Sequence, residues 1–153
     1  MSKRPKSKIP LSVVGISQHG QLSEIERKIH GLTTPREENP HINLKYFDKN
    51  FECFGAWQTE ELKAFSGFIE KLNQTNWTDI CKSSGKAGNK SGFGMTYHKD
   101  RKKLPLTTIL DEISPDIKFF ELRVNQKARV HGFRSVSSFF LVWLDRNHKI
   151  YPQ

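Results

Sequence analysis

The last third of the chain constrains the fold most, because three strand-like runs follow one another with only short turns between them. The runs cover residues 118–124, 128–135 and 139–144, and short turns at 125–127 and 136–138 separate them. The last run, FFLVWL, is continuously apolar and short enough to be a strand that is covered on both faces. This pattern predicts a three-stranded antiparallel meander.

The segment before the meander predicts two helices. From Gln58 to about Lys82, apolar side chains recur at helical spacing and form one stripe: Leu62, Phe65, Phe68, Ile69 and Leu72. The polar stretch at 73–76 is expected to break this helix, and a second short helix is expected to follow it. A further helical turn is expected at 107–113.

The pattern ahead of the helices predicts a β-hairpin. Residues at 42–46 and at 51–55 alternate between apolar and polar, and a polar turn at 48–50 lies between them. The expected fold class is therefore α+β, with an N-terminal hairpin, two helices and the C-terminal three-stranded meander. The helices are expected to cover one face of the sheet.

A single domain is expected over residues 40–153, preceded by a basic flexible tail at 1–39. Within the domain, residues 82–105 hold four glycines and seven basic residues without a clear period, which predicts a Gly/Lys-rich loop. This loop does not match a phosphate-binding P-loop, because Lys90 stands where that motif requires glycine.

The charge of the chain favours an anionic partner. The formal net charge is +9 and the sequence pI is about 9.7, so a nucleic acid is the first expectation. No apolar run is long enough for a membrane span or a secretory signal. Two cysteines, Cys53 and Cys81, are too few for a disulfide framework or a four-ligand zinc site. We therefore expect a cytoplasmic protein that does not engage a membrane.

The candidate chemistry lies in the meander and directly after it. Arg129 and His131 share one strand face, and Arg123 interrupts an apolar run on the strand before. Few carboxylates accompany them, which disfavours metal-dependent hydrolysis, and the GxSxG motif of serine hydrolases is absent.

The mixture suits cleavage of RNA without a metal. A base removes the proton of the ribose 2′-OH, cations stabilise the developing charge, and an acid protonates the leaving oxygen. Six side chains are the candidate catalytic residues, with no metal and no cofactor expected: Arg123, Arg129, His131, Arg146, His148 and Tyr151. Nucleic-acid contacts are expected from eight basic side chains: Lys86, Lys90, Lys99, Arg101, Lys102, Lys103, Arg134 and Lys149.

The run ELRVNQKARVHGFRSVSSFFLVWLDRNHKIY resembles the C-terminal meander of RelE/ParE-type toxins. The resemblance places Arg123 and Arg129 on the meander arginines of that family. It places Arg146, His148 and Tyr151 on the terminal stretch where ribonuclease members carry catalytic groups. It implies a toxin-like RNA endonuclease with an acidic antitoxin as a partner. The two helices agree with the family in order only, so no helical residue is given a role.

Two other functions stay open at this point. A protein with a toxin-like scaffold could bind nucleic acid without cleaving it, or its basic surface could bind an acidic protein. The same residues also have purely structural interpretations. Arg123 and Arg129 could pair with Glu121 or Asp145 across the strands, and His131 could be a hydrogen-bonded histidine of the sheet.

Overall fold

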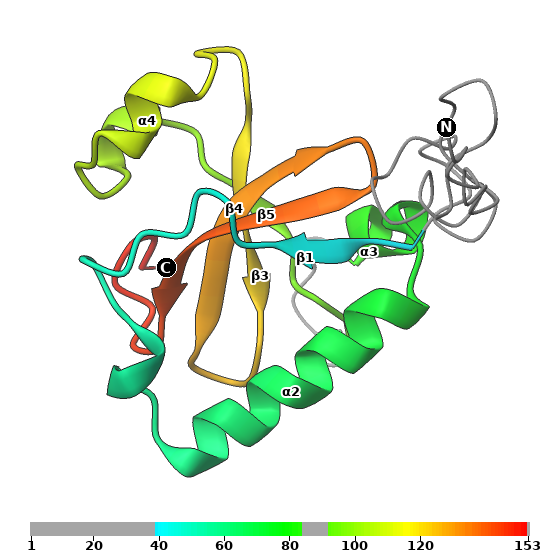
Figure 1. The fold of residues 1–153 in the computed structure, drawn as a ribbon. Helices are drawn as coiled ribbons and strands as arrows, with labels where there is room; N and C mark the ends of the chain where they lie inside the picture. The colour runs from blue at the N-terminus through cyan, green and yellow to red at the C-terminus, as the bar shows by residue number, and fades with distance from the viewer. Residues whose placement is uncertain (1–38, 84–91, 153) are drawn as a thin grey trace, which may run out of the picture.

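The computed structural model describes residues 39–83 and 92–152. The predicted tail falls almost wholly outside these residues, as do Lys86 and Lys90 of the predicted loop. The described chain is a mixed α+β structure with a five-stranded sheet (Figure 1). None of its described helices is both long and apolar enough to cross a membrane.

The sheet has the strand order β1-β5-β4-β3-β2. Strand β1 runs parallel to β5, and every other neighbouring pair is antiparallel. The strands are β1 (His41–Asn43), β2 (Thr96–Tyr97), β3 (Phe119–Arg123), β4 (Arg129–Ser135) and β5 (Ser138–Asp145). Strand β5 lies inside the sheet, which explains why its sequence is apolar on both faces.

Two helices cover one face of the sheet, and the prediction of two helices with a break between them is confirmed. Helix α2 (Thr59–Gln74) begins with a capping box in which Gln58 and Glu61 exchange hydrogen bonds. Helix α3 (Trp77–Lys82) begins after Asn76, whose side chain accepts a hydrogen bond from the Asp79 backbone N–H.

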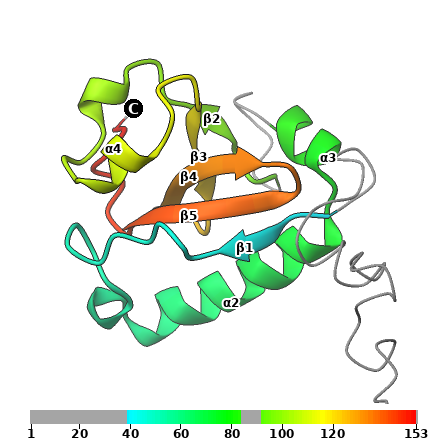
Figure 2. The same ribbon diagram turned by 45° about the horizontal axis from the view of Figure 1, so that its top comes forward.

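The predicted apolar stripe of α2 packs against the sheet. Phe65, Phe68 and Leu72 are buried in a core that includes Leu122 and Leu141 from the strands. Figure 2 shows α2 along one side of the sheet and α4 (Ile109–Glu112) with the C-terminal segment on the other. A second apolar cluster fills that other side, and its buried members are Leu104, Ile113, Phe119, Phe133, Val142, Trp143 and Ile150.

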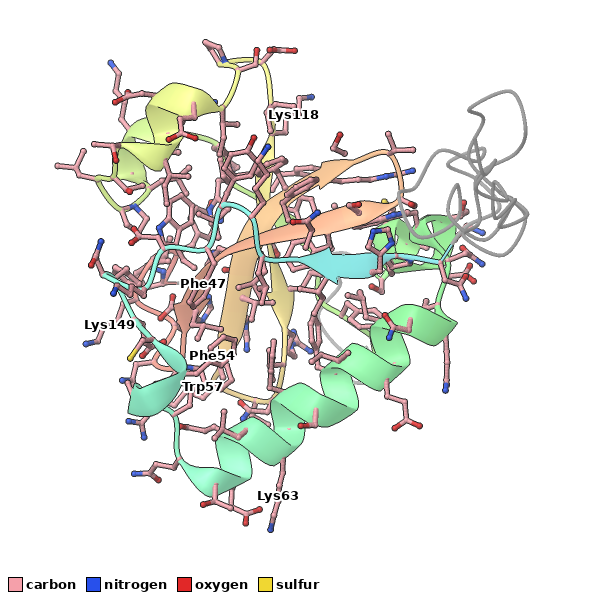
Figure 3. All side chains as sticks on the ribbon, in the orientation of Figure 1. Phe47, Phe54, Trp57, Lys63, Lys118 and Lys149 are labelled. Atoms are coloured by element: carbon pink, nitrogen blue, oxygen red, sulfur yellow. The ribbon has the colours of Figure 1, made fainter. Side chains whose placement is uncertain are left out.

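The predicted N-terminal hairpin is wrong. Strand β1 pairs with β5 instead, and the second half of the expected hairpin contains a short 3₁₀ helix, η2 (Phe54–Ala56). The loop between them is tied to β5, because the Asp48 backbone N–H donates to the Val142 carbonyl at 2.8 Å. Three aromatic side chains of this segment, Phe47, Phe54 and Trp57, pack into the core on the side of α2 (Figure 3).

The predicted Gly/Lys-rich loop is not loop throughout. Within it, β2 pairs with β3 and forms an edge of the sheet, and Arg101–Lys103 form a 3₁₀ turn, η3. The three C-terminal strands occur where their runs predicted them, but β1 and β2 flank them on both sides. The RelE-like arrangement of a hairpin with a three-stranded sheet is therefore not confirmed.

A β-bulge in the middle of the sheet decides which side chains share a face. His131 pairs with Trp143, whereas the next residue, Gly132, pairs with Leu141, so Val142 is an extra residue in β5. The extra residue reverses the alternation after it, and Asp145 comes to the same face as His131. Without the bulge, Leu144 would take that face and Asp145 would point toward α2.

Gly132 is required by this bulge. A Cβ atom at position 132 would lie 1.9 Å from the Phe140 carbonyl oxygen, far inside van der Waals contact. We expect Gly132→Ala to lower the free energy of unfolding by about 3 kcal/mol or more, measured by urea denaturation.

Gly67 in α2 supplies the matched control, because a Cβ atom there meets nothing within 4 Å. Gly67→Ala is expected to raise the free energy of unfolding by about 0.5–1 kcal/mol, as alanine favours helix. Equal effects of the two substitutions would contradict the assignment of the bulge.

Candidate active site

A group of polar side chains from β3, β4 and the end of β5 lies on the face of the sheet opposite α2. Glu121 pairs with His131, while Arg123 pairs with Arg129, which in turn pairs with Asp145. Because residues two apart on a strand share a face, all five point to one side of the sheet. This buried position is unusual for charged groups and marks the region as a candidate site.

Two histidines and one aspartate form a hydrogen-bonded chain. His98 lies just beyond β2, and its Nε2 is 3.0 Å from Nδ1 of His131. Nε2 of His131 is 3.2 Å from Oδ2 of Asp145. The two imidazole rings are 26° from parallel, with centroids 5.1 Å apart, so they meet edge to edge through this hydrogen bond. His131 is fully buried, whereas His98 is partly exposed, so the chain leads from the interior toward solvent.

Asp145 also holds the C-terminal segment in place. Its two carboxylate oxygens accept hydrogen bonds from the backbone N–H groups of Lys149 and Ile150, each at 2.8 Å. Burial opposes ionisation of Asp145, but the hydrogen bonds from His131, Ile150 and Lys149 outweigh it and hold its pKa below the usual value. The residue is therefore a buried carboxylate ion.

Glu121 joins a second histidine to the cluster. Its Oε2 lies 3.3 Å from Nε2 of His148 and 4.0 Å from Nδ1 of His131, and Arg129 Nε lies 3.9 Å from Oε1. His148 reaches this position with a left-handed backbone, φ 54°. Burial raises the pKa of Glu121 to about 7; Asp145 adds to the rise and the two arginines oppose it.

Burial favours the neutral form of all three histidines. It lowers the pKa of His98 to about 4, with a further contribution from His131. It also lowers the pKa of His131 and of His148, in each case with the charge of Arg129 acting in the same direction. At neutral pH the site therefore combines neutral imidazoles with a glutamic acid that is close to half protonated.

Arginine and tyrosine side chains border the histidines. Arg123 is partly exposed, and its guanidinium lies against Gly94, where an added Cβ would be 3.0 Å from the Nη2 atom. Arg129 is buried and donates to the Asn125 carbonyl at 2.9 Å. Tyr151 meets the His98 ring edge to face, with centroids 5.3 Å apart.

The structure brings five of the six predicted catalytic residues into this region: Arg123, Arg129, His131, His148 and Tyr151. Arg146 is the exception. Its guanidinium binds Glu61 at 2.9 Å and the Ala56 carbonyl at 3.0 Å, so it connects the chain after β5 to α2 and η2.

Two of the predicted nucleic-acid contacts, Arg101 and Arg134, make close contacts within the protein. The Arg101 guanidinium donates to the carbonyl oxygens of Leu110, Ile113 and Ser114, and so closes the end of α4. Arg134 stacks over the Trp77 ring, with its guanidinium carbon 4.7 Å from the ring centroid. The remaining predicted lysines that the structure describes are exposed: Lys99, Lys102, Lys103 and Lys149.

Sequence analysis did not assign Glu121, Asp145 or His98 to the site. Glu121 is two residues from Arg123, so strand periodicity alone could have placed it on the same face. Asp145 depends on the bulge, and His98 on the pairing of β2 with β3. Neither feature leaves a local signal in the sequence.

The fold and the site together define an α+β protein with a histidine, carboxylate and arginine cluster on one face of its sheet. In the part of the chain that is described, no three His, Cys, Asp or Glu side chains are arranged to hold a metal ion. Comparison with known proteins finds no matching family model, no matching curated protein and no matching solved structure. The functional proposal is accordingly argued from the site itself.

Glu121→Gln tests the buried acid. With its pKa at about 7 in the fold and near 4.5 when unfolded, Glu121 stabilises the protein as the neutral acid, and this stabilisation is lost as the pH rises toward 7. Glutamine lacks the ionisable group. We expect the unfolding free energy of E121Q, relative to the unsubstituted protein, to rise by about 2–3 kcal/mol between about pH 5 and about pH 8.

The control is Glu60→Gln, because Glu60 is an exposed carboxylate on α2. Its difference from the unsubstituted protein should stay constant over the same range. A constant difference for E121Q as well would show that Glu121 does not titrate in this window.

Proposed function

We propose that the protein is an endoribonuclease that cleaves RNA by attack of the ribose 2′-OH on the adjacent phosphodiester. One observation carries the proposal. A partly exposed neutral imidazole, His98, and a hydrogen-bonded pair that carries a proton, Glu121 and His148, lie on the same face of the sheet beside two arginines. These groups supply a base, an acid and fixed positive charge without a metal ion.

Each step has a group to carry it. His98 accepts the proton of the 2′-OH, the 2′ oxygen forms a bond to phosphorus, and the bond from phosphorus to the 5′ oxygen breaks. The Glu121 carboxyl gives its proton to Nε2 of His148, 3.3 Å away, while Nδ1 of His148 gives its own proton to the leaving 5′ oxygen, so that Glu121 ends as a carboxylate. The products are a 2′,3′-cyclic phosphate and a 5′-hydroxyl, and solvent then restores both protonation states.

A short series of contacts connects the two groups. From His98 Nε2 the path runs 3.0 Å to His131, 4.0 Å to Glu121 and 3.3 Å to His148. A bound phosphodiester also makes His98 a stronger base. Its negative charge favours the imidazolium, so the pKa of His98 rises from about 4 when substrate is present.

The two arginines have different parts. Arg123 is partly exposed and is positioned to contact a phosphate oxygen, where a guanidinium binds in a fixed geometry. Arg129 is buried, holds Glu121 at 3.9 Å and acts through its charge. Fixed charge in a poorly hydrated site stabilises the developing phosphorane more than charge in water does.

Exposed lysines border the site along the chain. Lys99 directly follows His98, Lys102 and Lys103 follow in η3, and Lys149 follows His148 and projects from the C-terminal segment (Figure 3). Such charges bind the phosphates that flank a cleaved bond, and they favour RNA over a neutral substrate. The resemblance of the C-terminal third to RelE/ParE toxins suggests a toxin-like role in the cytoplasm, with an acidic antitoxin as partner.

The first test is cleavage of single-stranded RNA in EDTA. We expect cleavage with 2′,3′-cyclic phosphate ends, and a loss of at least about 100-fold in kcat/KM for His98→Gln. Glutamine keeps an N–H donor for His131 but has no basic nitrogen.

Lys63→Gln is the control for this test, because Lys63 projects from α2 away from the sheet (Figure 3). Its rate should match that of the unsubstituted protein. Salt-sensitive RNA binding without any cleavage would refute the proposal and favour the non-catalytic alternative.

The second test is the pH dependence of kcat/KM. Activity should fall below about pH 4, where His98 becomes protonated, and should fall above about pH 7, where the Glu121–His148 pair loses its proton. Activity near pH 5–6 should therefore exceed activity near pH 9. A rate that rises steadily up to pH 9 would contradict these roles.

A further inference from the structure

We infer that Asp145 and His131 form a positioning relay that fixes the tautomer of His98, so that Nε2 of His98 carries the proton and Nδ1 is the free base. The inference concerns which nitrogen of one histidine is protonated. Its structural part is independent of any activity, and its catalytic part rests on the proposed ribonuclease function.

The relay starts at Asp145, which can only accept hydrogen bonds when ionised. Two of its acceptor positions are taken by the backbone N–H groups of Lys149 and Ile150. Its Oδ2 also lies 3.2 Å from His131 Nε2, which must therefore be the donor. A neutral His131 that is protonated on Nε2 has a lone pair on Nδ1.

The second step transfers this choice to His98. The nearest group to His131 Nδ1 is Nε2 of His98 at 3.0 Å, whereas Oε2 of Glu121 is 4.0 Å away, beyond hydrogen-bond distance. Two lone pairs facing each other at 3.0 Å would repel, so His98 must donate through Nε2. Its Nδ1 is then unprotonated, and within the described residues Nδ1 has no hydrogen-bond partner.

The consequence is that a buried carboxylate selects the reactive atom of a partly exposed base. Asp145 does not touch the substrate, so it is a positioning residue and not a catalytic residue. The carboxylate of a Ser-His-Asp triad acts in the same way. It orients the histidine base, and its loss leaves that base in the wrong tautomer. Here one more imidazole lies between the carboxylate and the base.

The experiment is nitrogen NMR of the full-length protein with ¹⁵N-labelled histidine near neutral pH. We expect His98 to show a protonated Nε2 and an unprotonated Nδ1, with a scalar coupling across the hydrogen bond to His131 Nδ1. A protonated Nδ1 on either His98 or His131 overturns the inference. This measurement needs no variant and no substrate.

Asp145→Ala extends the test, because alanine leaves no acceptor for His131. We expect His98 to show a mixture of tautomers, and kcat for RNA cleavage to fall at least about tenfold while KM changes little. A single unchanged tautomer in D145A overturns the relay. A loss confined to KM overturns its catalytic part alone.

Asp48→Ala is the matched control. Asp48 is also a buried aspartate and accepts from a ring N–H, that of Trp143 at 3.3 Å, but it does not bind either histidine of the relay. D48A should keep the His98 tautomer. If the tautomer signature is present but RNA is not cleaved, the relay stands and the ribonuclease proposal fails, so the two outcomes are distinguishable.

Discussion

The site depends on one irregularity of the backbone, the extra residue that β5 carries opposite the His131–Gly132 step. Before it, apolar residues of β5 face the helices and the opposite side in regular alternation. After it, Trp143 and Asp145 face away from α2 and Leu144 faces the helix-side core. Gly132 permits the close approach of the Phe140 carbonyl that the bulge requires. Asp145 therefore meets His131 because of the backbone, not because of strand periodicity.

Regular periodicity in the sequence predicted regular structure well. The stripe from Leu62 to Leu72 located α2, the polar stretch at 73–76 located its end, and the three C-terminal runs located β3, β4 and β5. The hairpin prediction was wrong because the alternating residues at 51–55 do not pair as a strand: Phe51, Cys53 and Gly55 are exposed, and β1 pairs with β5 instead. The parallel pairing of β1 with β5 joins residues almost 100 positions apart, and no local pattern encodes it.

The sequence predicted only part of the candidate site. Arg123, Arg129, His131 and His148 were found because they stand out as polar groups in or beside apolar strands. Glu121, Asp145 and His98 complete the hydrogen-bonded cluster, but their places in it arise from burial and from contacts between strands. Burying two carboxylates, one arginine and a histidine together is costly unless they compensate one another, and the hydrogen bonds and ion pairs on this face provide that compensation.

The place of His98 in the fold has a consequence for how the site fails. Strand β2 is two residues long and lies at the edge of the sheet, and the His98 backbone N–H donates to the Phe119 carbonyl at 2.9 Å just beyond it. Short edge segments open locally at far lower free energy than a whole domain unfolds. On warming, this corner should fray while β3, β4 and β5 stay folded, and the imidazole would leave its partner before any cooperative transition. The contact between His98 and His131 would then be lost before melting, with the interior of the sheet still protected from hydrogen exchange.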